Sequence, residues 1–144
     1  MPAFDERTTA AAPPEEVWKL LYDPARFPDW WVGVATIEPG GGSGSGSDDD
    51  HDDDGGAYTM YPDGYPDFPM PQELRTSRAR GRVEISCLVS DLEFSWQLTP
   101  RDGGAATEIA VHVEIPPSEA HRLETQTDVI RRSLANLARL AAES

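Results

Sequence analysis

Few residues of this chain combine the type and spacing that acid–base chemistry requires. His112 lies between Glu108 and Glu114 on the polar side of an apolar–polar repeat, so we expect it on a solvent-facing surface. His121 falls in the expected first turn of the last helix, where it is also exposed. His51 lies inside an acidic run. The pattern therefore places no histidine as a general base.

Cys87 is the only cysteine, which excludes an intramolecular disulfide and a multi-cysteine metal site. It shares its strand face with Val83, Ile85 and Val89. No histidine or cationic partner can be assigned to the thiol, so a small buried side chain is favoured over a nucleophile. There is no Ser-His-Asp order and no phosphate-binding loop. We predict no catalytic residue.

Residues 40–56 read GGGSGSGSDDDHDDDGG, and six of the seven positions 48–54 are aspartate. Carboxylates of this kind suit Ca²⁺ or Mg²⁺. However, no glycine lies within the aspartate run to shape a binding turn, and no glutamate closes it. Gly/Ser composition gives flexible coil, and the aspartates repel one another. We expect a disordered loop insertion at 40–56, with no metal and no cofactor bound to the protein.

Aromatic and sulfur-containing side chains are better candidates, because they could supply the walls of an apolar cavity. For any one of them taken singly, core packing is the favoured interpretation, and they indicate a cavity only as a group. The candidate ligand-binding residues of this kind are Trp31, Tyr58, Met60, Phe68, Phe94 and Trp96.

Polar candidates could orient a ligand in such a cavity. Arg78 faces inward if Leu74 and Thr76 do, which would place a cation against a carboxylate or phenolate. The alternative is a solvated arginine within a basic cluster. Thr127, next to Gln126, interrupts an apolar helical stripe that continues to Ile130. We include Arg78, Thr127 and Ile130 among the candidate ligand-binding residues.

The chain has 144 residues, which favours a single domain. Its 26 acidic residues outnumber 12 Lys and Arg, for a net charge of -14. This charge disfavours nucleic acids and anionic membrane surfaces as partners. Residues 1–7 already include charged side chains and do not resemble a signal peptide. No apolar run approaches the length of about 18 residues that a membrane-spanning helix needs. We expect a soluble cytoplasmic protein, monomer or homodimer, without membrane insertion.

The elements that must position these residues follow from periodicity. Apolar–polar alternation is clearest over 92–99 and 107–115 and indicates antiparallel strands with one covered face. The expected strands are 4–11, 32–37, 57–61, 72–80, 82–90, 92–99 and 107–115. Between the third and fourth, four prolines in 62–71 forbid regular pairing and predict an ordered loop or lid.

Three helices are expected. Pro13, Pro14 and two glutamates open the first, and Asp23-Pro24 ends it. A second short helix covers 24–31. A third begins at Ser118 and carries an apolar stripe over Leu123, Thr127, Ile130, Leu134, Leu137 and Ala141. Such a helix requires a long apolar surface, which only the sheet can provide.

The segment 12–31, APPEEVWKLLYDPARFPDWW, resembles the opening of the polyketide cyclase/dehydrase and lipid-transport family. The order of the elements also resembles the helix-grip fold, called Bet v 1-like or START-like. The resemblance covers nearly the whole chain outside 40–56. It implies an α+β domain over 1–144, with a seven-stranded curved antiparallel sheet, two short helices and a long C-terminal helix.

The resemblance implies a cavity between sheet and terminal helix, but no shared catalytic motif. The first hypothesis is binding of a small hydrophobic, lipid- or polyketide-like molecule, without assignable catalysis. The second is an aromatase/cyclase-type enzyme acting in the same cavity, which two or more buried titratable groups would favour. The third is a protein-interaction module, which predicts a closed cavity and an exposed apolar patch around Trp30, Trp31 and the proline loop.

Overall fold

The computed structural model describes residues 3–39, 53–62, 64, 67–88 and 91–143. One antiparallel sheet contains seven strands in the order β1-β7-β6-β5-β4-β3-β2. The strands are β1 (Ala3–Ala10), β2 (Val34–Pro39), β3 (Asp53–Pro62), β4 (Met70–Ser77), β5 (Arg82–Cys87), β6 (Glu93–Arg101) and β7 (Ala106–Glu114). The curved sheet with its helices confirms the predicted α+β helix-grip fold class.

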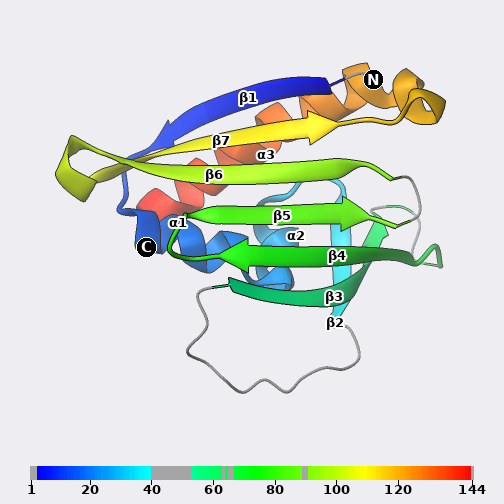
Figure 1. Ribbon diagram of the computed structural model, residues 1–144, viewed down its shortest axis with the longest axis horizontal. Coiled ribbons are helices and arrows are strands. Elements are labelled where there is room, and N and C mark those ends of the chain that lie inside the picture. Colours follow the sequence, from blue (N-terminus) through cyan, green and yellow to red (C-terminus); the bar gives the residue numbers. More distant parts are fainter. Residues whose placement is uncertain (1–2, 40–52, 63, 65–66, 89–90, 144) are drawn as a thin grey trace.

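The helices lie together on one side of the sheet (Figure 1). They are α1 (Pro14–Leu21), α2 (Phe27–Trp30) and α3 (Leu123–Glu143). In α3, Ile130, Leu134, Leu137 and Ala141 are buried against the sheet and the two short helices. None of the described helices is long and apolar enough to cross a bilayer.

The predicted alternation of the strands is present. In β6 and β7, Phe94, Trp96, Ile109 and Val111 are buried, and the side chains between them are more exposed. Because strand side chains alternate between faces, one face of the sheet builds the core and the other carries polar groups.

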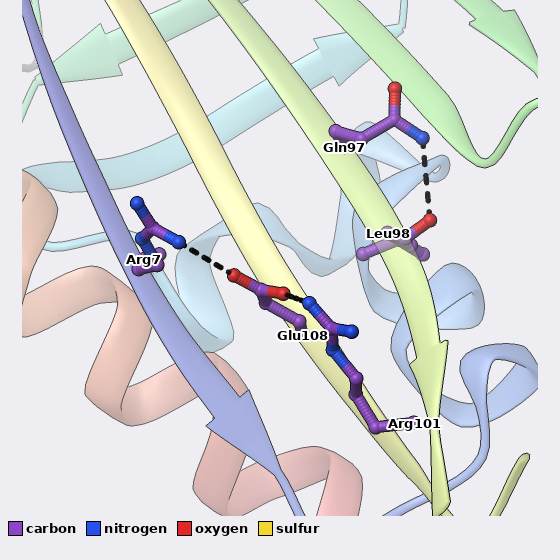
Figure 2. A network of polar contacts seen from close by, with 5 residues as sticks. All are labelled: Arg7, Gln97, Leu98, Arg101 and Glu108. Carbon is purple, nitrogen blue, oxygen red and sulfur yellow. Dashed lines mark hydrogen bonds and ion pairs between the residues drawn. The ribbon is translucent and has the colours of Figure 1, made fainter. Parts of the chain in front are cut away.

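On the polar face of the sheet, ion pairs join neighbouring strands. Glu108 of β7 lies between two arginines, Arg7 of β1 at 3.2 Å and Arg101 of β6 (Figure 2). Hydrogen bonding to Arg101 is the largest cause that lowers the pKa of Glu108, with Arg7 adding to it. Figure 2 also shows Gln97 of β6 donating to the Leu98 carbonyl at 3.3 Å.

Several boundaries differ from the sequence-based predictions. β3 begins at Asp53, whereas residues 53–56 were expected within the loop. These residues extend the strand because they pair with residues 74–77 of β4. The remainder of the expected loop, with His51, lies outside the described residues, as does Val89. β2 begins at Val34 rather than Val32, because the Val34 N–H donates to the Trp31 carbonyl at 3.2 Å in a turn where Gly33 has φ 91°.

The last helix also begins later than expected. Pro117–Arg122 form a 3₁₀ turn in which Glu119 has non-helical backbone angles, and α3 starts only at Leu123. Ser118 therefore does not cap it. A 3₁₀ turn at the start of an α-helix changes the direction in which the first side chains point.

Candidate binding cavity

A cavity of about 440 Å³ lies on the helix-covered side of the sheet. It falls within the roughly 300–1,000 Å³ range of small-molecule sites. Its lining comes from α2, the turn after it, β2 to β6 and the start of α3. The residues are Phe27, Trp31, Val32, Gly33, Val34, Tyr58, Met60, Pro62, Phe68, Met70, Gln72, Cys87, Leu92, Phe94, Arg122, Gln126 and Val129.

Exposure distinguishes the floor of the cavity from its mouth. The buried lining residues are Phe27, Trp31, Tyr58, Gln72, Cys87, Leu92 and Phe94. The mouth is formed by more exposed residues, among which Phe68 is 50% exposed and Arg122, Gln126 and Val129 are half-buried. An entering molecule would thus pass between the start of α3 and the loop that carries Phe68.

Trp31 is the centre of the aromatic floor. Its ring lies 5.2 Å from those of Phe27 and Phe94 and 5.3 Å from that of Trp96. Tilted and edge-to-face contacts at these separations are favourable and hold the rings in fixed orientations. The floor is therefore an ordered surface with defined aromatic edges.

Local sequence explains how the rings reach this position. Pro24 follows the end of α1, and the Asp23 side chain accepts the Ala25 N–H at 3.1 Å, which starts the turn leading into α2. The indole N–H of Trp30 then donates to the Leu20 carbonyl at 2.9 Å. Since the last carbonyls of a helix lack intrahelical partners, this bond both completes α1 and fixes α2 against it.

Three polar side chains cross the floor on adjacent strands. Tyr58 of β3 pairs in register with Gln72 of β4, which pairs with Cys87 of β5. We call these three residues the polar row. Each is 4% exposed, and all three line the cavity. Burial, and then the nearby Cys87, raises the pKa of Tyr58 far above its usual value, so the phenol stays protonated.

The wall at the start of α3 includes Arg122, the last residue of the preceding 3₁₀ turn and the one charged residue among the described lining residues. Its Nε donates to a Glu119 carboxylate oxygen, which forms an ion pair at the mouth. Gln126 and Val129 follow at helical spacing on the same face. Within the described part of the chain, no Asp, Glu or His side chain lines the cavity, and no group of three or more potential metal ligands is found.

Of the nine residues proposed from sequence, the structure brings five to the cavity: Trp31, Tyr58, Met60, Phe68 and Phe94. Trp96 is fully buried beside Trp30 and Trp31, below the cavity surface. Ile130 is also fully buried in the core. The Thr127 hydroxyl donates to the Leu123 carbonyl at 2.7 Å and does not line the cavity.

Arg78 does not face inward as the strand parity suggested. Leu74 and Thr76 are buried as expected, but β4 ends at Ser77, and Arg78 enters the turn to β5. There it forms an ion pair with Glu15 of α1, and its side chain is 61% exposed. Strand parity no longer applies once the chain turns.

Sequence reasoning missed the rest of the lining. Gln72 shares the parity of Leu74 and Thr76, so an inward position could have been found from that signal. Cys87 was correctly expected to be buried, but its position on the cavity wall was not foreseen. Arg122 carried no usable signal, because its direction depends on the 3₁₀ turn before α3.

A smaller hollow of about 220 Å³ lies between strands β5, β6 and β7, with Glu84, Glu93, His112 and Glu114 around it. His112 contacts Asp5 at 2.7 Å and Glu114 at 3.1 Å. Hydrogen bonds to these two carboxylates raise the pKa of His112. As expected, this histidine is on a solvent-facing surface and away from the cavity.

The sheet, the terminal helix and the cavity between them define a helix-grip protein. Residues 1–142 match the family described as polyketide cyclase/dehydrase and lipid transport, and the chain belongs to this family. It has no match among curated protein sequences.

Solved structures share the fold at low sequence identity. The XoxI protein of Bacillus cereus is 14% identical with a TM-score of 0.74, over 96% of this chain and 94% of that one. The Zhui aromatase/cyclase of Streptomyces sp. R1128 is 16% identical with a TM-score of 0.71, over 97% and 93%. In the di-domain ARO/CYC BexL, the match is 14% identical with a TM-score of 0.73, over 96% of this chain and 46% of BexL. At identities this low, the TM-scores show a shared fold.

Proposed function

We propose that the protein binds a small, largely apolar molecule, lipid- or polyketide-like, in the cavity between sheet and α3. The observation that supports this is the cavity of about 440 Å³ with a buried aromatic floor. A volume of this size is typical of sites that hold drug-sized molecules, roughly 300–1,000 Å³. Burying such a ligand against aromatic rings is favourable because apolar surface leaves water.

An aromatase/cyclase enzyme is the second candidate. It is favoured by the burial of two titratable groups, Tyr58 and Cys87, on one cavity floor, and by the names of two structures with the same fold. The protonated Tyr58 can donate a hydrogen bond or a proton but cannot serve as a base near neutral pH. With no carboxylate or imidazole among the described lining residues, binding is the better supported role.

The third hypothesis, an interaction module, required an exposed aromatic patch. Trp30 and Trp31 are 1% and 8% exposed, so among the described residues of the expected patch only Phe68 of the proline loop, 50% exposed, is at the surface. The rings of the two tryptophans are used in the core and in the cavity floor instead, which supports a ligand-binding role over a docking role.

Native mass spectrometry before and after a denature–refold wash tests the proposal. We expect a co-purifying mass of a few hundred daltons, or binding of members of a panel of fatty acids, sterols and aromatic polyketides detected by tryptophan fluorescence. Val129→Trp fills the mouth and should weaken binding about tenfold or more, whereas Arg132→Trp on the exposed side of α3 should not. A clean apo mass without any fluorescence response would contradict the proposal.

A further inference from the structure

The polar row is unusual for its surroundings. Tyr58 and Gln72 are direct cross-strand partners, and the rest of the floor is formed by Phe27, Trp31 and Phe94 with Leu92. A cavity that served only to exclude water would gain more from apolar side chains at these positions. Polar side chains there require a hydrogen-bonding partner.

The protein provides hydrogen-bond partners for only some of the polar atoms of Tyr58 and Gln72. The Gln72 side-chain N–H donates to the Met70 carbonyl at 3.3 Å. Among the described residues, the Gln72 side-chain oxygen and the Tyr58 hydroxyl have no hydrogen-bond partner. Neither is among the atoms that are both fully enclosed and unpaired, so both remain accessible from the cavity. A ligand that displaces water from these two atoms leaves them unpaired, which is costly, unless the ligand offers a polar atom of its own.

We infer that Tyr58 and Gln72 form a specificity site for a neutral oxygen, a carbonyl or hydroxyl group, on the ligand of the proposed function, on which this inference rests. The Tyr58 O–H donates to a carbonyl oxygen, and the Gln72 side-chain oxygen accepts from a hydroxyl. Two neighbouring groups of opposite capacity can also hold one hydroxyl between them. Cys87 completes the row as a weakly polar neighbour.

The site selects a neutral group over an anion. No cationic side chain belongs to the row, and the Arg122 Nε at the mouth is already paired with Glu119. A carboxylate at the floor would lose its hydration without gaining a counter-charge, which is a large penalty. The apolar body of the ligand lies against the rings around Trp31.

Three naphthalene derivatives of similar size provide the test. Methyl naphthyl ketone carries a neutral oxygen, ethylnaphthalene lacks it, and naphthoate carries a charge. Their dissociation constants are measured by displacement of N-phenylnaphthylamine from the full chain, after the affinity of the probe for each variant is determined directly. We expect the ketone to bind roughly three- to tenfold more tightly than ethylnaphthalene, the value of one net hydrogen bond, and naphthoate to bind most weakly.

Variants then assign the effect to residues. Tyr58→Phe and Gln72→Met should each reduce the preference for the ketone and leave binding of ethylnaphthalene unchanged or stronger. Tyr61→Phe is the matched control, because Tyr61 lies on the same strand and its hydroxyl donates to Glu38 at 3.0 Å, away from the cavity lining. Circular dichroism verifies folding, and the comparison of three ligands on the unmodified protein stands without any variant.

The outcomes separate the inference from the proposed function. Three results would overturn the specificity site and leave the binding function intact. They are equal affinities for the ketone and ethylnaphthalene, a higher affinity for naphthoate than for the ketone, and a preference for the ketone that persists in both variants. If neither the probe nor any of the three compounds binds the unmodified protein, the binding function itself fails.

Discussion

The backbone N–H of Val32 donates a hydrogen bond of 2.9 Å to the hydroxyl of Ser133, which lies 101 positions later in the chain. Ser133 is fully buried in α3 and in turn donates to the Val129 carbonyl at 2.7 Å. One turn away, the Asn136 side chain donates to the Trp30 carbonyl at 3.2 Å. The segment that forms one wall of the cavity is therefore fastened to the helix that forms the other.

Ser133→Ala should lower the free energy of unfolding by about 1–3 kcal/mol, because the Val32 N–H loses its partner in a partly buried place. Urea denaturation measures the change. Ser118→Ala, at an exposed serine, is the control and should have little effect. Equal stabilities for the two variants would mean that water replaces the serine hydroxyl without cost.

Gly81 should not tolerate a side chain. Its φ is +63°, and a Cβ would lie 2.9 Å from the Leu98 carbonyl oxygen, next to the 2.8 Å bond from the Leu98 N–H to the Gly81 carbonyl. Gly104→Ala isolates the backbone effect, since Gly104 has φ +98° but no neighbouring atom within 4 Å. We expect about 1–2 kcal/mol of destabilisation at Gly104 and clearly more at Gly81 in denaturant unfolding. A smaller loss at Gly81 would show that β6 moves aside.

His112 should make stability depend on pH. Hydrogen bonds to Asp5 and then Glu114 raise its pKa in the folded protein above the ordinary value of 6.5. The native state therefore favours the protonated ring, and the added stability is fully present below pH 6.5 and is lost as pH rises through the folded-state pKa. The melting temperature of the unmodified protein minus that of His112→Gln should fall across this range. His121→Gln is the control, and a difference independent of pH would refute the linkage.

Arg78→Ala should leave ligand binding unchanged and alter the free energy of unfolding by only about 0–1 kcal/mol. The pair of Arg78 with Glu15 is solvent-exposed on both sides, and such pairs contribute little. Fluorescence titration and urea denaturation of the variant measure the two quantities. A large loss of ligand affinity would give Arg78 a part in binding, although it does not line the cavity.

The sequence was informative where one periodicity runs through a whole element. Alternation over 92–99 predicted the buried face of β6, including Phe94, because side-chain direction in a strand depends on parity alone. Parity likewise assigned Leu74 and Thr76 correctly. It failed at Arg78 because the end of a strand is decided by the turn and its partners, which are nonlocal.

The cavity side of α3 shows the same distinction. The apolar stripe correctly located the packed side of the helix, with Leu134, Leu137 and Ala141 buried. Ile130 of the same stripe, proposed as ligand-binding, is fully buried in the core and does not line the cavity. At the start of the helix, Leu123 is 37% exposed, and Arg122, Gln126 and Val129 face the cavity instead. A stripe of apolar residues shows which side of a helix packs against the rest of the protein. A surface that faces a ligand need not be apolar, so the stripe does not show where that surface lies.

The strand order also bears on how the chain folds during its synthesis. β1 has one neighbour in the sheet, β7, and Ala3 is aligned with Glu114. The 101 positions that separate Arg7 from its partner Glu108 take on the order of 5–20 s to synthesise at roughly 5–20 residues per second. Throughout that interval β1 lacks its neighbour β7 in the sheet, and its backbone edges are open to pairing with other chains.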